Sequence, residues 1–290
     1  MIKQNTKKLS KKIIQSYRKT TDLSVLKCVS ESLTSLLPVL LISTFILVLM
    51  EFPLPAYQNV IKNSLGGKTL TALGYIYKNT YGMLSVYMTI AIASNINRHY
   101  GKVSHRLATI FVALASFFIL SGAFNDSVFN ADMLGPKNTF TAIICAVISS
   151  SMYMILSKRL VVSSTHYGDG IIVDYSTIFT SLIPIVLILE IFSCANLILT
   201  SYGYVSFYCM YTSWLSGLFS NMQKSVLNLV RFELLQNLLW SFGIHGSDVL
   251  SEIKYLVFDT AQAINKAQVA AGKSPTLILT GVFIDVFVIF

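Results

Sequence analysis

Five long apolar stretches constrain what this chain can fold into more than any other feature of its sequence. Four of them carry no charged residue over 17 or 18 positions, and the fifth, 26 residues long, carries only Glu190. A helix needs about 20 mostly apolar residues to cross the hydrocarbon layer of a bilayer, whereas a barrel strand needs only about 10. Because these stretches are apolar on all sides, they predict membrane-spanning helices. They cover Leu33–Met50, Asn79–Ile96, Leu107–Phe124, Phe140–Leu156 and Tyr175–Thr200.

The composition excludes most other classes of protein. The 290 residues are 54% hydrophobic and 12% charged, with a mean hydropathy of +0.64. Soluble domains carry about 25% charged residues, so this chain could not cover a water-facing surface. A soluble enzyme, a disordered chain and a secreted disulfide scaffold are therefore excluded. The four cysteines form no C-x-x-C pair and show no metal-ligand spacing, so we expect neither a disulfide framework nor a metal site.

The basic residues predict how the chain is oriented in the membrane. If the N-terminus is cytoplasmic, the inner segments hold 13 Lys and Arg residues and the outer loops hold four. Lys and Arg are enriched on the cytoplasmic side of membrane proteins. We therefore expect a multi-pass protein of the bacterial cell membrane with its N-terminus in the cytoplasm.

The N-terminal segment, residues 1–32, is strongly basic, with eight Lys and Arg residues against two acids. Its apolar residues Leu9, Ile13, Ile14 and Tyr17 recur at helical spacing, which is typical of a helix lying among anionic lipid head groups. A disordered basic tail is the alternative. Base-stacking motifs are missing from the sequence, so we expect no nucleic-acid partner.

Two prolines and one carboxylate interrupt the apolar stretches. Pro38 and Pro184 each remove a backbone hydrogen bond, which predicts either a packing kink or a moving hinge. A carboxylate near the bilayer centre must be neutralised, hydrogen-bonded or in contact with water. Glu190 therefore has either a structural role or a role in transport, and the sequence leaves both open.

The regular pattern ends after Tyr202. Residues 203–226 mix aromatic and polar residues and predict an interfacial segment. A helix follows over residues 226–239, in which leucines and valines recur at helical spacing among polar side chains. Because its polar residues are excluded from lipid, that side of the helix must meet water, protein or a ligand cavity. The polar residues are Arg231, Glu233, Gln236 and Asn237.

This polar helix leads directly into the sequence WSFGIHGSD, residues 240–248. Gly243 and Gly246 break a helix and allow the backbone to approach a bound group closely. A neutral His245 both donates and accepts hydrogen bonds, and Trp240 offers a flat face to a sugar ring. A purely structural histidine in a turn is the alternative. The segment predicts a re-entrant hairpin, because non-helical backbone at membrane depth must be buried in protein or line a cavity.

This segment resembles the W-x-F-G-I-H-G signature of enzyme IIC, the membrane permease component of bacterial sugar phosphotransferase systems. The match is to the lactose/cellobiose/diacetylchitobiose branch of that family. Other stretches are similar to the family in the same order along the chain, so the resemblance covers nearly all of it. They are Leu37–Pro55, Tyr87–Tyr100, His105–Phe118, Ser176–Leu189 and Thr280–Phe290.

The resemblance implies a fold of two parts. Residues 33–202 would be a five-helix bundle that forms a homodimer, and residues 203–290 part of a sugar-binding domain with a re-entrant hairpin. His245 would contact a β-linked disaccharide such as cellobiose, chitobiose or lactose, while Trp240, Gly243 and Gly246 shape the hairpin. A cysteine of the separate IIB component, working with IIA, would phosphorylate the sugar. We therefore expect no catalytic residue, cofactor or metal in this chain.

The sequence also departs from the family pattern. The family continues into a G-G-x-G turn and an N-E-P motif, whose glutamate contacts sugar, and neither occurs here before Phe290. Residues 276–290, taken as a helix, would be about 22 Å long and too short to span a bilayer. A shortened paralogue that serves as a dimerising structural or regulatory subunit is therefore the alternative to a permease. The identity of the sugar stays open.

Overall fold

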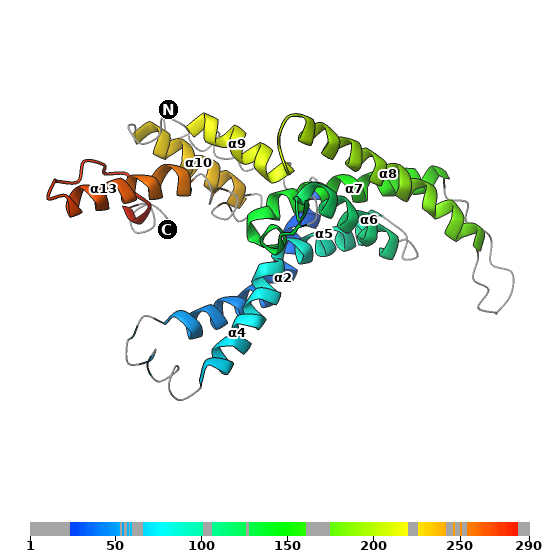
Figure 1. Cartoon of the computed structure of the whole chain (residues 1–290). Helices are drawn as coiled ribbons and strands as arrows, with labels where there is room; N and C mark the ends of the chain where they lie inside the picture. The colour runs from blue at the N-terminus through cyan, green and yellow to red at the C-terminus, as the bar shows by residue number, and fades with distance from the viewer. Residues whose placement is uncertain are drawn as a thin grey trace, which may run out of the picture.

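The computed structural model is almost entirely α-helical (Figure 1). It describes residues 24–52, 66–100, 106–125, 128–160, 175–219, 226–241 and 254–283, together with Leu54, Tyr57, Asn59, Gly246 and Leu250. Three described helices are long and apolar enough to cross a membrane. They are Val25–Glu51, Pro136–Arg159 and Ser181–Ser201. The expectation of an all-α membrane fold is confirmed.

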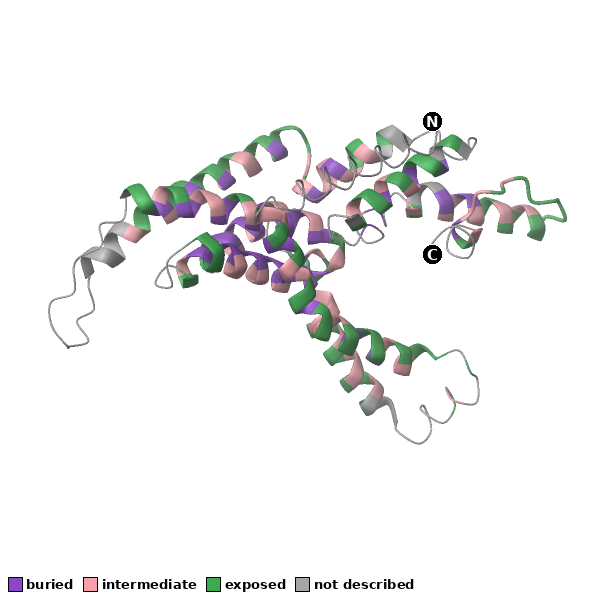
Figure 2. Cartoon of the chain, turned by 180° about the vertical axis from the view of Figure 1, so that it is seen from behind, coloured by how far each residue is buried: buried purple, intermediate pink, exposed green. Residues whose placement is uncertain are grey.

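Each of the five predicted apolar stretches overlaps a long helix. The helices are α2 (Ser24–Glu51), α5 (Leu84–Tyr100), α6 (Arg106–Ser121), α7 (Thr139–Leu160) and α8 (Tyr175–Ser201). α7 packs against α5, α6 and α8, and α2 packs against α5. The buried residues concentrate where these helices meet (Figure 2). Whether they act as one dimerising bundle, and whether a domain boundary lies near residue 202, stay predictions.

The helix over residues 66–80 was not predicted, and the second predicted stretch is not one continuous helix. Residues 66–80 form α4 (Gly66–Thr80), which the short 3-10 turn η2 (Tyr81–Met83) separates from α5. α4 packs against α2, and these two helices project together from the rest of the molecule (Figure 1). Lysines, threonines and tyrosines occur throughout α4, so it has no apolar stretch that would have indicated a helix.

The third predicted stretch ends three residues early, because the helix α6 stops at Ser121. Gly122 follows with a φ of +72°, a conformation that terminates a helix. The connection to α7 contains a two-stranded antiparallel ribbon, β1 (Phe124–Asn125) and β2 (Val128–Phe129). Two 3-10 turns follow, and the buried Asn138 side chain donates to the Ser121 carbonyl at 2.9 Å.

The C-terminal part consists of shorter helices that lie together (Figure 1). They are α9 (Phe207–Phe219), α10 (Val226–Ser241), the π-helical turn η7 (Tyr255–Asp259) and α13 (Thr260–Ala270). The prediction that a helix begins at Thr276 is wrong, because residues 273–280 carry no helical turn and helix resumes only at residues 281–283. Side chains of α13 hydrogen-bond the backbone of this segment at Thr276 and Leu277.

Polar contacts join α2 to α5 near the start of α2. The Glu31 carboxylate accepts from Arg98 at 2.8 Å and lies 2.9 Å from His99 Nε2. One residue further on, the buried Ser32 hydroxyl accepts from Asn95 at 2.8 Å. α2 begins at Ser24, inside the segment expected to be a basic tail, and residues 1–23, with the expected lipid-bound helix, lie outside the described residues.

We expect Gly122→Ala to destabilise the fold more than Gly203→Ala. Both glycines have positive φ, +72° and +82°, which costs an alanine about 1–2 kcal/mol. Only at Gly122 would the new Cβ also collide with a neighbour, at 2.6 Å from Ser206 Cβ, which adds about 1–3 kcal/mol. Thermal unfolding in detergent, followed as loss of the monodisperse fraction, measures the difference. Equal unfolding midpoints for the two variants would contradict the close contact.

Candidate functional site at the end of α10

The helix α10 turns a polar residue inward and apolar residues outward. Its buried residues are Leu229, Phe232 and Gln236, and the Gln236 side chain is only 4% exposed. Its exposed face carries Leu227, Val230, Leu234 and Leu238 together with the polar residues Arg231 and Asn237. The four residues of the predicted polar side therefore do not share one environment, because Gln236 is buried in protein and Glu233 half-buried while the other two are exposed. That the polar side meets water, protein or a ligand cavity stays a prediction.

Glu233 lies one turn before Gln236 on the same side of α10 and is half-buried. Among the described residues, nothing donates a hydrogen bond to its buried carboxylate oxygen Oε1. A buried acceptor without a donor is costly, so this oxygen is suited to receive a hydroxyl group from a ligand. The sequence indicated a polar side for this helix but did not distinguish Glu233 from its polar neighbours.

The chain folds back onto α10 after its last residue. Gly246 is buried, and a Cβ at this position would lie 2.5 Å from the Gln236 carbonyl oxygen. The Gly246 carbonyl then accepts from the Leu250 amide at 3.0 Å, which is the spacing of a helical turn. Further along, Phe258 packs edge-on against Phe232 with ring centroids 5.4 Å apart. Gly246 therefore fits this place because only a residue without a side chain can approach the backbone of α10 so closely.

The structure describes two of the four predicted site residues. Trp240 lies in the last turn of α10 and is 47% exposed, and Gly246 packs against the same helix one turn earlier. Gly243 and His245 lie outside the described residues. The structure thus places Trp240, Gln236 and Gly246 at one end of α10, and the role of His245 stays a prediction.

A non-helical segment beside α13 was missed by sequence reasoning. The Asn265 side chain donates to the Leu277 carbonyl at 2.6 Å and accepts from the Leu277 amide at 3.1 Å. One turn later, Gln268 accepts from the Thr276 amide at 3.1 Å. These amide side chains thus satisfy the backbone amides of Thr276 and Leu277 and the carbonyl of Leu277. Amides three residues apart on a helix, followed by Pro275, are the signal that could have indicated it.

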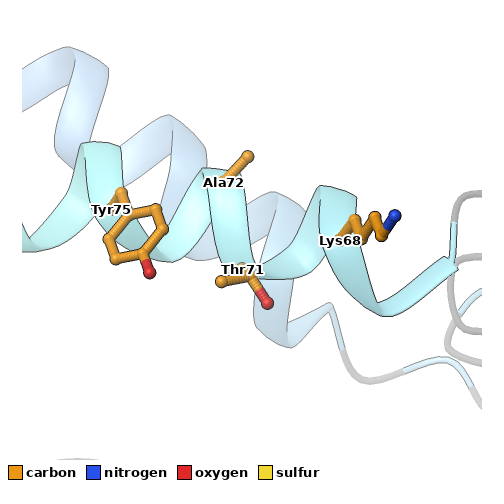
Figure 3. Close-up of a pocket in the computed structure, with 4 residues that line it drawn as sticks. All are labelled: Lys68, Thr71, Ala72 and Tyr75. Carbon is orange, nitrogen blue, oxygen red and sulfur yellow. The ribbon is translucent and has the colours of Figure 1, made fainter.

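Two other features contribute no candidate chemistry. A surface pocket on α4 is lined by Lys68, Thr71, Ala72 and Tyr75, all from a single helix (Figure 3). It therefore brings no groups together from different parts of the fold. Within the described residues, no group of three or more His, Cys, Asp or Glu side chains is placed to hold a metal ion.

Comparison with known proteins assigns the fold to a class and then to a family. Long apolar helices, joined to a helix with an inward polar side, define an integral membrane protein. The family model "Phosphotransferase system, EIIC" matches residues 30–290, and the chain belongs to this family of membrane transporters. The fold is shared with the crystal structure of ChbC, the IIC component of the N,N'-diacetylchitobiose-specific phosphotransferase system. That comparison has a TM-score of 0.64 and 21% identity, and covers 96% of this chain and 67% of ChbC.

Curated relatives are similar at low identity. The chain is 23% identical to the lichenan permease IIC component of Bacillus subtilis, a match that covers 91% of this chain and 60% of that protein. It is 25% identical to the cellobiose-specific EIIC component of Geobacillus stearothermophilus, covering 79% of this chain and 52% of the relative. The chain thus spans between about half and two thirds of the length of the curated relatives it matches.

We expect Gly246→Ala to destabilise the turn at the end of α10. Its new Cβ would meet the Gln236 carbonyl, a backbone atom that no rotamer change can move, at a cost of about 1–3 kcal/mol. Gly217→Ala in α9 is the matched control, because a Cβ there has nothing within 4 Å. The measurement is the thermal unfolding midpoint in detergent. Rescue of Gly246→Ala by a second substitution, Gln236→Ala, would contradict a clash with the backbone.

Proposed function

We propose that this chain acts as the sugar-translocating IIC component of a bacterial phosphoenolpyruvate-dependent phosphotransferase system. Its substrate would be a β-linked disaccharide such as cellobiose, chitobiose or lactose. The family match over residues 30–290 carries the proposal. Relatives named for lichenan, cellobiose and oligo-beta-mannoside, and a structural neighbour named for N,N'-diacetylchitobiose, support a β-linked substrate.

We assign sugar binding to the end of α10. His245 would exchange hydrogen bonds with sugar hydroxyls, and Trp240 would stack on the apolar face of a sugar ring. Gly243 and Gly246 would shape the turn that holds the histidine, which the close approach of Gly246 to α10 supports. The unpaired Glu233 oxygen, on the same side of α10, would accept a further hydroxyl.

The proposal places the protein in the bacterial plasma membrane as a multi-pass homodimer with its N-terminus in the cytoplasm. The basic N-terminal residues would bind anionic lipid there. The separate IIB and IIA components would supply the phosphoryl group from the same side. Cys28 lies on α2 and is completely buried, so we do not assign it as a phosphoryl carrier.

The alternative of a shortened structural or regulatory subunit is not favoured by the comparisons. All four curated relatives are IIC components or permeases, and the match to the lichenan permease extends over 91% of this chain. No described feature of the fold points to a regulatory role in particular. Transport is therefore the function we test.

We expect the two tryptophans of the chain to respond differently to sugar. In a Trp214→Phe variant, Trp240 is the remaining tryptophan, and cellobiose or diacetylchitobiose should change its fluorescence on titration. Trp214 is 65% exposed on α9 and is not among the proposed sugar contacts, so a Trp240→Phe variant should show no such change. His245→Ala should weaken binding about five- to 100-fold, because buried sugar hydroxyls lose their partner. Unchanged affinity in His245→Ala would contradict the assignment of this residue.

Transport itself is tested by uptake. Cells that produce this chain together with cognate IIA and IIB should accumulate labelled, phosphorylated disaccharide. The His245→Ala variant, produced at the same level in the membrane, should not. A well-folded chain that binds disaccharide but gives no uptake with its partners would contradict independent transport and leave the binding site standing.

A further inference from the structure

An apolar groove of about 360 Å³ lies between the start of α2 and the helix α7. Its wall on α2 consists of Val25, Leu26 and Val29. Its wall on α7 consists of Phe140, Ile143, Ile144, Val147 and Ile148. None of these lining residues is polar, and Ile148 is 46% exposed. The groove therefore opens at the surface of the fold and has room for further apolar side chains.

The N-terminal segment joins the described fold at this groove. Ser24 is the first described residue, and Val25 of the groove wall follows it directly. Residues 1–23 are thus covalently attached to one wall of the groove. They bring with them the apolar residues that recur at helical spacing, which are Leu9, Ile13, Ile14 and Tyr17.

The apolar side of this segment and the groove have the same length. As a helix, the segment rises about 12 Å from Leu9 to Tyr17, at about 1.5 Å per residue. The α7 wall rises about 12 Å from Phe140 to Ile148 for the same reason. The residues between Tyr17 and Ser24 span about 20 Å when extended, which is enough for the helix to fold back along the groove.

The charges of the segment favour the same arrangement. Its basic residues lie on the other side of the helix and are Lys7, Lys8, Lys11, Lys12 and Arg18. Because no described residue that lines the groove is charged, only the apolar side of the segment suits it. The basic side then faces lipid head groups or water. Contact with the groove and contact with anionic lipid would use opposite sides of one helix.

We propose that residues 9–17 form a helix whose apolar side fills the groove between α2 and α7. The contact ties the N-terminal segment to α7, a helix more than 100 residues further along the chain. It assigns the segment an intramolecular partner in addition to the membrane surface. The inference goes beyond the proposed function, because it depends on neither sugar binding nor transport.

Disulfide crosslinking of the full chain in nanodiscs tests the contact. Ile13→Cys is combined with Ile144→Cys, because these positions are the midpoints of the two 12 Å runs and meet whichever way the segment points. After oxidation with copper phenanthroline, we expect a disulfide within one chain, identified by mass spectrometry of the monomer band. Cysteines whose Cα atoms are more than about 7 Å apart do not bridge, so two control pairs should give at least about fivefold less. One replaces Ile13→Cys by Lys12→Cys, and the other replaces Ile144→Cys by Ile155→Cys, which is exposed on α7 outside the groove.

Filling the groove gives an independent test of the same contact. Ile148→Trp places a large ring in the groove and should lower the crosslink between positions 13 and 144 at least about fivefold, whereas Ile155→Trp should leave it unchanged. An equal yield with Lys12→Cys, as expected if lipid fills the groove, would overturn the proposal. So would a crosslink found only between two chains, or one that Ile148→Trp does not reduce.

Discussion

The hydrocarbon of a membrane offers no hydrogen-bond partner, and this constraint explains most of what the chain does with its polar groups. Hydroxyl side chains within the long helices bond to carbonyls of their own helix, as Ser43 does to Val39 at 2.7 Å and Ser149 to Cys145 at 2.5 Å. Small residues such as Ala113 of α6 and Ala146 of α7 are completely buried, and these two helices pack against each other. In lipid the hydrophobic effect does not drive helices together, so van der Waals packing between closely approaching helices stabilises their association instead.

The same constraint makes α10 the most informative helix of the C-terminal part. A soluble protein would expose Gln236, whereas here Gln236 is buried and three leucines of the same helix, Leu227, Leu234 and Leu238, are exposed. After α10 the chain returns, and Gly246 packs closely against the backbone of Gln236. This close contact leaves no room for lipid between the two residues. Glu233, one turn away, lacks a donor among the described residues. Near the end of α10 the buried Glu233 oxygen Oε1 could therefore accept a hydrogen bond from a polar ligand. This is one reason why we propose the sugar site here.

The long helices could be predicted from the sequence because length and apolarity alone identify them. What depends on particular contacts could not be. α4 is helical beside α2 although its own residues are mixed, and residues 276–277 lie against α13 because Asn265 and Gln268 hydrogen-bond their backbone. Residues 240–248 were singled out by their residue types, and the structure adds the contact between Gly246 and Gln236. No residue pattern indicates that contact, because it joins positions across a turn.

The two acidic residues Glu190 and Glu233 show that a sequence pattern does not predict which face of a membrane helix packs against the protein. The inward side of α10 could not be inferred from spacing alone, because of its four polar residues Gln236 is buried and Glu233 half-buried while Arg231 and Asn237 are exposed. α8 is apolar on every side, and nothing in its sequence distinguishes the face that packs from the face that does not. Packing against α6 and α7 decides this, and it directs Glu190 outward. Because Glu190 points away from α6 and α7, we do not assign it to the site at the end of α10.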